Sequence, residues 1–217
     1  MATEFQPKLA ILPEEQRRLW PELSSVPQPF VLCGGTAIAV QLGHRASFDF
    51  DFIAFEDFDP DALENKLPLL VGAKTLQKSP GTLTCLVDRG APIQVSFFGA
   101  STLRLVNSPR IALDNGLRIA SLLDLAGMKA AVVQKRAEAK DYFDIDAILQ
   151  QAIIDLPNAL AAARAIYGQT FNAQLTLKSL CFFGDGNLKT LPREIQNRLA
   201  AAVRSVDLNR LPEIKSP

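Results

Sequence analysis

The stretch CGGTAIAVQLGHRASFDFDF, residues 33–52, holds the densest group of functional residue types in the chain. Its glycine pair, Gly34 and Gly35, precedes Thr36 and an apolar run that is typical of a helix. Further on, the run FDFDFIAF from Phe48 to Phe55 alternates aspartates with phenylalanines before it turns apolar, which is the periodicity of a β-strand. The stretch therefore predicts a glycine turn into a helix, followed by a strand that carries two carboxylates.

The two carboxylates of that strand predict a metal site. Successive side chains of a strand alternate between its faces, so Asp49 and Asp51 project to one side. Phe48, Phe50 and Phe52 are expected on the opposite side, in the core. Neighbouring carboxylates repel each other unless a cation or proton lies between them, and Mg²⁺ often binds only one or two carboxylates plus substrate phosphates. We therefore expect Asp49 and Asp51 to bind Mg²⁺.

The glycine turn predicts a phosphate site. Gly34 and Gly35 allow the backbone to approach a ligand, and the start of the following helix carries partial positive charge. The Thr36 hydroxyl can donate to a phosphate oxygen. A glycine pair alone often serves only to turn the chain, but together with the two aspartates it favours a nucleoside triphosphate.

The residues between helix and strand have two interpretations each. His44 is either a structural hydrogen-bonding group at a helix end or part of the site. Arg45, together with Ser47, either steadies the strand or contacts a nucleotide phosphate, for which the guanidinium fork is suited.

Composition limits the classes of protein. The chain has 217 residues, 23 basic and 23 acidic side chains, and 48% hydrophobic residues, so it is neither disordered nor a strongly basic nucleic-acid coat protein. Three dispersed cysteines and one histidine argue against a Cys/His zinc site and suit a reducing compartment. Without a signal-peptide pattern or a long apolar run, we expect a cytoplasmic protein with no membrane partner.

The pattern of elements predicts an α+β fold. Residues 1–118 are expected to form a lobe with a mixed β-sheet and flanking helices, and residues 119–217 a helical lobe. Expected helices cover 13–20, 34–43, 61–70, much of 121–154, 158–168 and 192–206; expected strands cover 30–33, 48–55, 82–87 and 92–98.

A second group of charged residues lies in the helical half. Lys129, Arg136 and Lys140 would form one basic stripe if a single helix ran through all three, with Asp141 and Asp144 nearby. The alternative is a solvated helix face with ordinary ion pairs such as Lys140–Asp144.

Two segments together resemble a known family. CGGTAIAVQLGHRASFDFDF is similar to the GGTAhxhxhxHRxSxDxDh motif of the AbiEii-like abortive-infection nucleotidyltransferase toxins, and DLAGMKAAVVQKRAEAKDYFDIDAIL resembles their later DLxxxKhxAhxxRxxxKDxxDhxxL segment. The resemblance implies the nucleotidyltransferase fold of the DNA polymerase β-like superfamily, with a short mixed sheet and a C-terminal helical bundle. The motifs cover about residues 30–55 and 121–149.

The resemblance also implies roles for individual residues. Gly34, Gly35 and Thr36 would bind the triphosphate, Asp49 and Asp51 would hold Mg²⁺, and Lys129 would contact the phosphates. The KDxxD element, Lys140, Asp141 and Asp144, would form part of the site wall, with Arg136 beside it. The reaction expected is transfer of NMP from an NTP to a hydroxyl of tRNA or protein by a toxin that a cognate antitoxin restrains.

One departure from the superfamily keeps alternatives open. Its enzymes usually supply a third carboxylate from a later strand, but the corresponding segment here, PIQVSFF, offers Gln94 and Ser96. Asp88 is the nearest acid and lies before the turn. Asp141 or Asp144 could act as the base, one Mg²⁺ could suffice, or the chain could be a nucleotide-binding pseudoenzyme that acts as an interaction module. A small-molecule nucleotidyltransferase of the aminoglycoside type is a third hypothesis.

Overall fold

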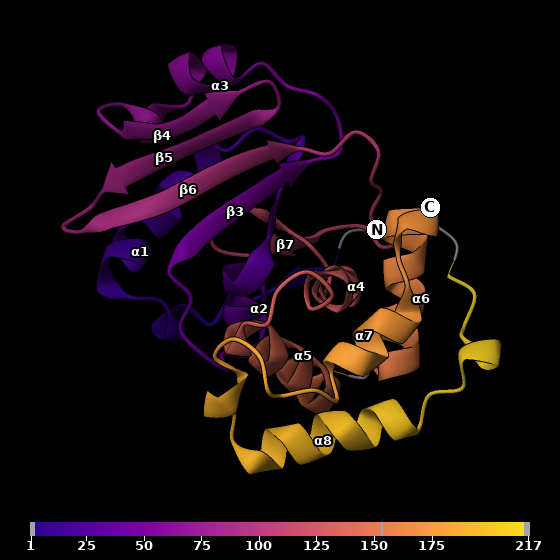
Figure 1. Ribbon diagram of the computed structural model, residues 1–217. Helices are drawn as coiled ribbons and strands as arrows, with labels where there is room; N and C mark the ends of the chain where they lie inside the picture. Colours follow the sequence, from indigo (N-terminus) through magenta and orange to yellow (C-terminus); the bar gives the residue numbers. More distant parts are fainter. Residues whose placement is uncertain (1–2, 153, 215–217) are drawn as a thin grey trace. The chain divides into compact units, whose positions relative to one another are not determined.

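The computed structural model describes residues 3–152 and 154–214, which form two compact units (Figure 1). The first unit comprises Met1–Arg104 and Ser108–Ala120, and the second comprises Leu105–Asn107 and Ser121–Pro217. The predicted division after residue 118 lies two residues before the chain enters the second unit at Ser121.

The first unit is built on a mixed sheet whose described strands follow the order β1-β7-β8-β2-β3-β6-β5-β4. The strands are β1 (Glu4–Phe5), β2 (Phe30–Cys33), β3 (Asp49–Ala54), β4 (Lys74–Ser79), β5 (Thr82–Asp88), β6 (Pro92–Gly99), β7 (Arg110–Ala112) and β8 (Arg118–Ile119). At the centre, β3 runs antiparallel to β2 and parallel to β6. This mixed sheet confirms the predicted α+β class. The texture of residues 73–113 is that of a strand meander, which contains β4 and β7 but did not give their bounds. Strands β1 and β8 have two residues each, show no periodicity and were not predicted.

One face of β3 packs into the core. Phe50 and Phe52 are fully buried, and the Phe52 ring stacks on Phe97 at 5.2 Å between centroids. The prediction that Phe48 joins them was wrong, because 64% of Phe48 is exposed. The strand begins only at Asp49, so strand alternation does not govern the residue before it.

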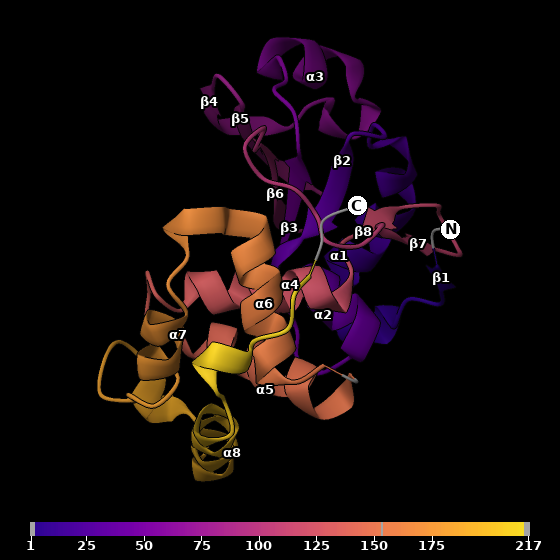
Figure 2. The same cartoon turned by 90° about the vertical axis from the view of Figure 1, so that its right-hand side faces the viewer.

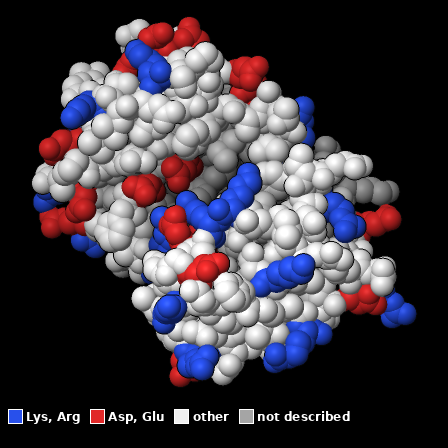
Figure 3. Space-filling view, viewed as in Figure 1, with Lys and Arg blue, Asp and Glu red and all other residues white. Residues whose placement is uncertain are grey.

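Three α-helices belong to the first unit: α1 (Glu14–Leu19), α2 (Gly34–Leu42) and α3 (Pro60–Lys66). The predicted helix over 61–70 ends early, because Pro68 removes a backbone donor and the chain continues as a short 3₁₀ turn. At the sheet edge beside α3, the Lys78 ammonium pairs with Asp61 at 2.7 Å and with Glu64 at 2.8 Å. Figure 3 shows such basic and acidic groups side by side over α3 and β4.

The second unit is helical, as predicted (Figure 2). Its helices are α4 (Leu122–Val132), α5 (Ala139–Gln151), α6 (Leu156–Tyr167), α7 (Ala173–Ser179) and α8 (Arg193–Arg204). Short 3₁₀ helices in the two units are η1 (Leu9–Ile11), η2 (Trp20–Ser25), η3 (Pro68–Leu70), η4 (Gly168–Thr170), η5 (Leu188–Thr190) and η6 (Leu208–Arg210). Over residues 3–152 and 154–214, no helix has the length and apolar character needed to cross a membrane.

Helix α4 approaches α6 closely at Gly127. A Cβ atom placed on this glycine would lie 2.8 Å from the backbone nitrogen of Ala163, far inside van der Waals contact. Alanines at 161–163 leave α6 equally narrow. Small residues on both helices therefore let α4 and α6 pack closely, and Lys129 near the end of α4 is buried.

The start of α4 is capped as its sequence predicts. The Ser121 hydroxyl accepts a hydrogen bond from the backbone N–H of Asp124 at 3.1 Å and donates to the Asp124 carboxylate at 2.6 Å. The same carboxylate accepts from the backbone N–H of Val106 at 2.6 Å, which fastens the 105–107 segment to the second unit. Burial raises the pKa of Asp124 despite these bonds.

Candidate active site

The glycine turn places the start of α2 directly against a carboxylate of β3. Gly34 has a φ of +74°, a conformation that strongly favours glycine. A Cβ atom at this position would lie 2.9 Å from Oδ2 of Asp51. The absence of a side chain on Gly34 therefore keeps the Asp51 carboxylate next to the backbone of the turn.

Arg45 and Ser47 lie over the second glycine. A Cβ atom on Gly35 would lie 2.7 Å from Nη2 of Arg45 and 2.9 Å from Oγ of Ser47. Arg45 Nη1 donates to the carbonyl oxygen of Ala46 at 2.8 Å, which folds the guanidinium back toward the turn. A guanidinium, a hydroxyl and the N-terminus of a nine-residue helix thus gather at one place, and all three favour an anion.

Thr36 has a structural partner. Its hydroxyl donates a 2.5 Å hydrogen bond to the main-chain carbonyl oxygen of Asp49, so its proton is already used. The predicted donation from Thr36 to a phosphate oxygen therefore does not fit this geometry. Instead, the threonine ties the first turn of α2 to the first residue of the carboxylate strand.

The donor set of β3 fits a magnesium ion. Asp49 is exposed and Asp51 half-buried, and the two flank the fully buried Phe50 on the same strand. Hard carboxylate oxygens at the rim of an anion site suit Mg²⁺, whose remaining positions phosphate oxygens and water can fill. Among residues 3–152 and 154–214, no cluster of three or more His, Cys, Asp or Glu side chains forms a complete metal cage.

The strand that would carry a third carboxylate lies where the sequence predicts. Strand β6 pairs with β3 in parallel, with Gln94 opposite Asp49 and Ser96 opposite Asp51. Gln94 Nε2 donates to Ser96 Oγ at 3.3 Å, so these two positions form a neutral pair. Asp88 lies at the far end of β5, opposite Pro92. The carboxylate set on β3 and β6 is therefore limited to Asp49 and Asp51.

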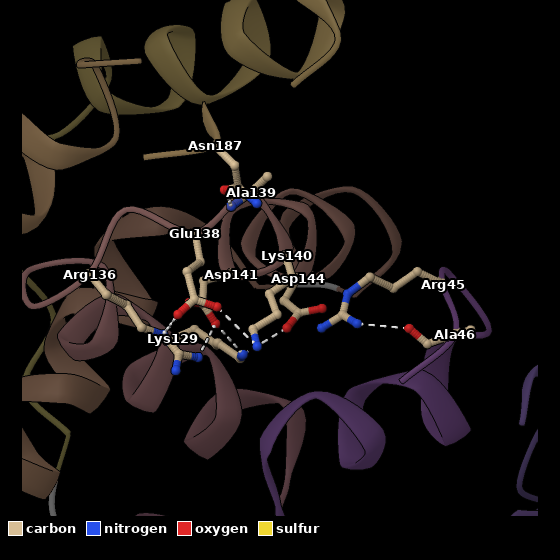
Figure 4. A network of polar contacts seen from close by, with 10 residues as sticks. All are labelled: Arg45, Ala46, Lys129, Arg136, Glu138, Ala139, Lys140, Asp141, Asp144 and Asn187. Carbon is tan, nitrogen blue, oxygen red and sulfur yellow. Dashed lines mark hydrogen bonds and ion pairs between the residues drawn. The ribbon is translucent and has the colours of Figure 1, made fainter. Parts of the chain in front are cut away.

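The second unit holds a buried charge cluster (Figure 4). Lys129 of α4 is only 6% exposed, and its Nζ lies 2.6 Å from Oδ1 of Asp141 and 2.7 Å from Oδ2 of Asp144 on α5. Arg136 donates to the same Asp141 carboxylate through Nε at 2.7 Å and Nη2 at 3.1 Å. The interpretation as a solvated face with a Lys140–Asp144 pair was wrong for these residues, because both carboxylates are fully buried.

The basic stripe predicted on one helix does not form. Helix α4 ends at Val132 and α5 begins at Ala139, whose backbone N–H is capped by Asn187 Oδ1 at 2.7 Å. Lys129 and Arg136 nevertheless converge, because the loop between the helices returns Arg136 to Asp141. Lys140 joins this group through Glu138, whose Oε2 lies 3.0 Å from the Lys140 Nζ.

The charge cluster also affects the acidity of its central carboxyl group. Burial favours the neutral form of Asp141, but the hydrogen bond from Arg136 and the charge of Lys129 outweigh it and hold the pKa below its usual value. A carboxylate with a lowered pKa and two cationic donors is a weak proton acceptor. The arrangement favours Asp141 and Asp144 as residues that position Lys129.

Two residues of this cluster, Glu138 and Asn187, were not predicted from the sequence. Glu138 pairs with Arg136 at 3.5 Å as well as with Lys140, and its only signal is its place between two basic residues. Asn187 lies 48 positions from the N–H that it caps, and no local pattern could have indicated that contact.

Comparison by sequence relates the chain to known proteins. The family model described as "Nucleotidyl transferase AbiEii toxin, Type IV TA system" matches residues 18–214. An uncharacterized protein of Aquifex aeolicus (strain VF5) is 32% identical over 178 residues, which cover 80% of this chain and 84% of that protein.

Solved structures share the fold. The nucleotidyltransferase toxin MenT4 of Mycobacterium tuberculosis H37Rv gives a TM-score of 0.63 at 17% identity, over 89% of this chain and 83% of MenT4. A protein of H. pylori gives a TM-score of 0.55 at 15% identity, over 88% of this chain and 92% of that one. The fold, the two motifs and the family match agree, and the chain belongs to the AbiEii family of nucleotidyl transferase toxins of type IV toxin–antitoxin systems.

Proposed function

We propose that the protein transfers a nucleoside monophosphate from an NTP to an acceptor hydroxyl and releases pyrophosphate. One observation carries the proposal: the Asp51 carboxylate lies against the side-chain-free Gly34 at the start of α2. A carboxylate that can bind a metal ion and a backbone that can bind phosphate are therefore close enough to contact the same nucleotide.

The residues of the first unit have distinct tasks in this proposal. The backbone at Gly34 and Gly35, together with Arg45 and Ser47, binds the triphosphate. Asp49 and Asp51 hold Mg²⁺, which when bound neutralises phosphate charge and orients the triphosphate. Thr36 sets the distance between the helix start and the carboxylate strand through its bond to Asp49.

The transfer step forms one bond and breaks another. The acceptor oxygen bonds to the α-phosphorus while the bond from that phosphorus to the bridging oxygen of pyrophosphate breaks. Gln94 and Ser96 cannot take the acceptor proton, because neither is a base, so we propose that it passes to solvent water. Catalysis then rests on positioning and charge neutralisation.

The cluster of the second unit is proposed to supply positive charge to the phosphates through Lys129. The family motif supports this role, and Asp141 and Asp144 fix the position of the ammonium. Arg136 and Lys140 are proposed as further substrate-binding residues. A cognate antitoxin is proposed as the partner, and tRNA or protein as the acceptor.

The test is label transfer from each α-labelled NTP, with Mg²⁺, into total tRNA and total protein. Wild type is compared with Asp49→Asn and Asp51→Asn, and with Asp57→Asn as a matched exposed carboxylate outside the site. We expect label with the wild type and Asp57→Asn only. Equal label with Asp51→Asn would overturn the mechanism. Absence of label alongside NTP-dependent thermal stabilisation would identify a nucleotide-binding pseudoenzyme.

A further inference from the structure

The second unit contains a cavity that the proposed reaction leaves unassigned. It has a volume of about 210 Å³ and is formed entirely within this unit. It is lined by the loop between α4 and α5, by Tyr142 of α5, and by residues from the end of α7 and the segment after it. Its lining includes Lys135, Arg136, Tyr142, Ser179, Phe182 and Asp185.

The walls of this cavity are held in place. The Tyr142 hydroxyl donates to the carbonyl oxygen of Ser179 at 3.1 Å, and Asn187 caps α5 from the segment after α7. Gly186 adopts a φ of +50°, and a Cβ there would lie 2.1 Å from the carbonyl oxygen of Ala137. Only glycine lets the two loops approach so closely, so the cavity is preformed and a ligand need not order it.

The chemistry of the lining combines an aromatic ring with cations. Phe182 lines the cavity and is 58% exposed, so its ring is accessible to a ligand. Lys135 is exposed, and its ammonium has no ion-pair partner in the part of the chain that the structure describes. Arg136 is anchored by Asp141, and Asp185 adds one acceptor. A flat apolar group with an attached anion matches this combination.

We propose that this cavity is a nucleotide site: the base stacks on Phe182 and the phosphate lies on Lys135 and Arg136. Aromatic rings and cationic grooves are the recurring elements of single-strand recognition. The volume is below the range of about 300–1,000 Å³ that holds drug-sized ligands, and it suits one base with its sugar. The nucleotide can be free or can be one residue of a single-stranded RNA.

The proposal rests on the proposed function only in giving the site a use, because an enzyme that acts on an RNA acceptor needs a surface that binds nucleotides. Arg136 belongs to both the cavity and the Lys129 cluster, since it donates to Asp141. An occupant of the cavity would therefore contact the same guanidinium that holds Asp141.

The experiment is photo-crosslinking of the full chain, with the crosslinked peptide identified by mass spectrometry. One arm uses 4-thiouridine monophosphate, and the other uses a single-stranded RNA hexamer with one terminal 4-thiouridine. Titrations of the fluorescein-labelled hexamer give affinities. The variants are Phe182→Ala and Lys135→Gln, with Leu175→Ala and Lys189→Gln as matched exposed controls outside the cavity.

We expect crosslinks to the 179–188 segment, and a loss of affinity of about five- to 100-fold in Phe182→Ala. Lys135→Gln should weaken binding and reduce its salt dependence, while the controls bind as the wild type does. Crosslinking by the hexamer alone identifies the RNA as the source, and crosslinking by both probes identifies a general nucleotide site.

Two results would overturn the proposal: no crosslink to this segment with either probe, or equal affinity in Phe182→Ala and Leu175→Ala. The Asp51→Asn variant separates this outcome from the proposed function. It should bind the hexamer as the wild type does while transferring no label. Label transfer by a protein that binds no nucleotide in the cavity would contradict only the cavity proposal and not the proposed function.

Discussion

The hydroxyl of Thr36 donates a 2.5 Å hydrogen bond to the main-chain carbonyl oxygen of Asp49. It joins the first turn of α2 to the residue at which β3 begins. The bond replaces the phosphate contact that the sequence suggests for Thr36. It instead holds the start of α2 against the start of β3. A shift of Asp49 relative to Gly34 would separate the proposed metal ligands from the backbone proposed to bind phosphate.

Thr36 is therefore expected to act as a positioning residue. Thr36→Val removes the donor of a part-buried hydrogen bond, which should lower the free energy of unfolding by about 0.5–1.5 kcal/mol. The rate of label transfer should fall more than the affinity for NTP. Thr36→Ser keeps the hydroxyl and should restore most of the rate. An equal loss of rate in Thr36→Ser and Thr36→Val would contradict the positioning role.

Gly34 provides a second test of the geometry, with a matched control in the same unit. Gly34 and Gly72 have φ angles of +74° and +77°, but a Cβ on Gly72 meets no atom within 4 Å. Gly72→Ala thus measures the conformational cost alone, about 1 kcal/mol. Gly34→Ala should cost more and should also weaken Mg²⁺-dependent NTP binding, because its Cβ displaces the Asp51 carboxylate.

Denaturant unfolding and NTP titrations measure the two effects. Gly72→Ala should bind NTP as the wild type does. If Gly34→Ala matched Gly72→Ala in both stability and NTP affinity, the close approach of Gly34 to Asp51 would contribute nothing to NTP binding.

The sequence predicted β3 because polar and apolar residues alternate along it, and α2 because a glycine turn precedes an apolar run. It also located β6 as the strand next to the carboxylates, including Gln94 and Ser96. It failed where contacts decide the outcome. At the break between α4 and α5, Asn187 caps the N–H of Ala139 and Arg136 pairs with Asp141. Neither contact has the spacing of three or four residues that a helical pattern predicts.

Lys129 should matter to stability as well as to function. Lys129→Met leaves the buried carboxylates of Asp141 and Asp144 without their shared ammonium, and breaking a buried pair in this way costs about 3–5 kcal/mol. Lys189→Met, at an exposed position, should change stability by less than about 0.5 kcal/mol. Adding Asp144→Asn to Lys129→Met should recover part of the loss. A cost for Lys129→Met no greater than that for Lys189→Met would show that the cluster is not stabilising.

The neutral pair on β6 predicts that metal affinity can be raised. Gln94→Asp places a third carboxylate opposite Asp49, which should lower the Mg²⁺ concentration for half-maximal transfer about tenfold. Without Mg²⁺ the variant should melt at a lower temperature, because the added charge repels Asp49 and Asp51. Gln77→Asp on the exposed edge strand β4 is the control and should alter neither value. An unchanged Mg²⁺ requirement in Gln94→Asp would place the metal elsewhere.

Ionisation of Tyr142 should lower the free energy of unfolding at alkaline pH. Burial, followed by the charges of Asp141 and Asp185, raises its pKa to about 12, against about 10 for an unfolded tyrosine. Because the folded pKa is the higher one, the stabilisation is fully present below pH 10 and is lost as the pH rises to 12. The difference corresponds to about 2–3 kcal/mol.

Urea unfolding at pH 9 and pH 11.5 should show a steeper loss of stability in the wild type than in Tyr142→Phe. At pH 9 the variant should be less stable by about 1 kcal/mol, because the bond to Ser179 is gone. Parallel losses in both proteins would mean that Tyr142 ionises as readily in the folded chain as in the unfolded one.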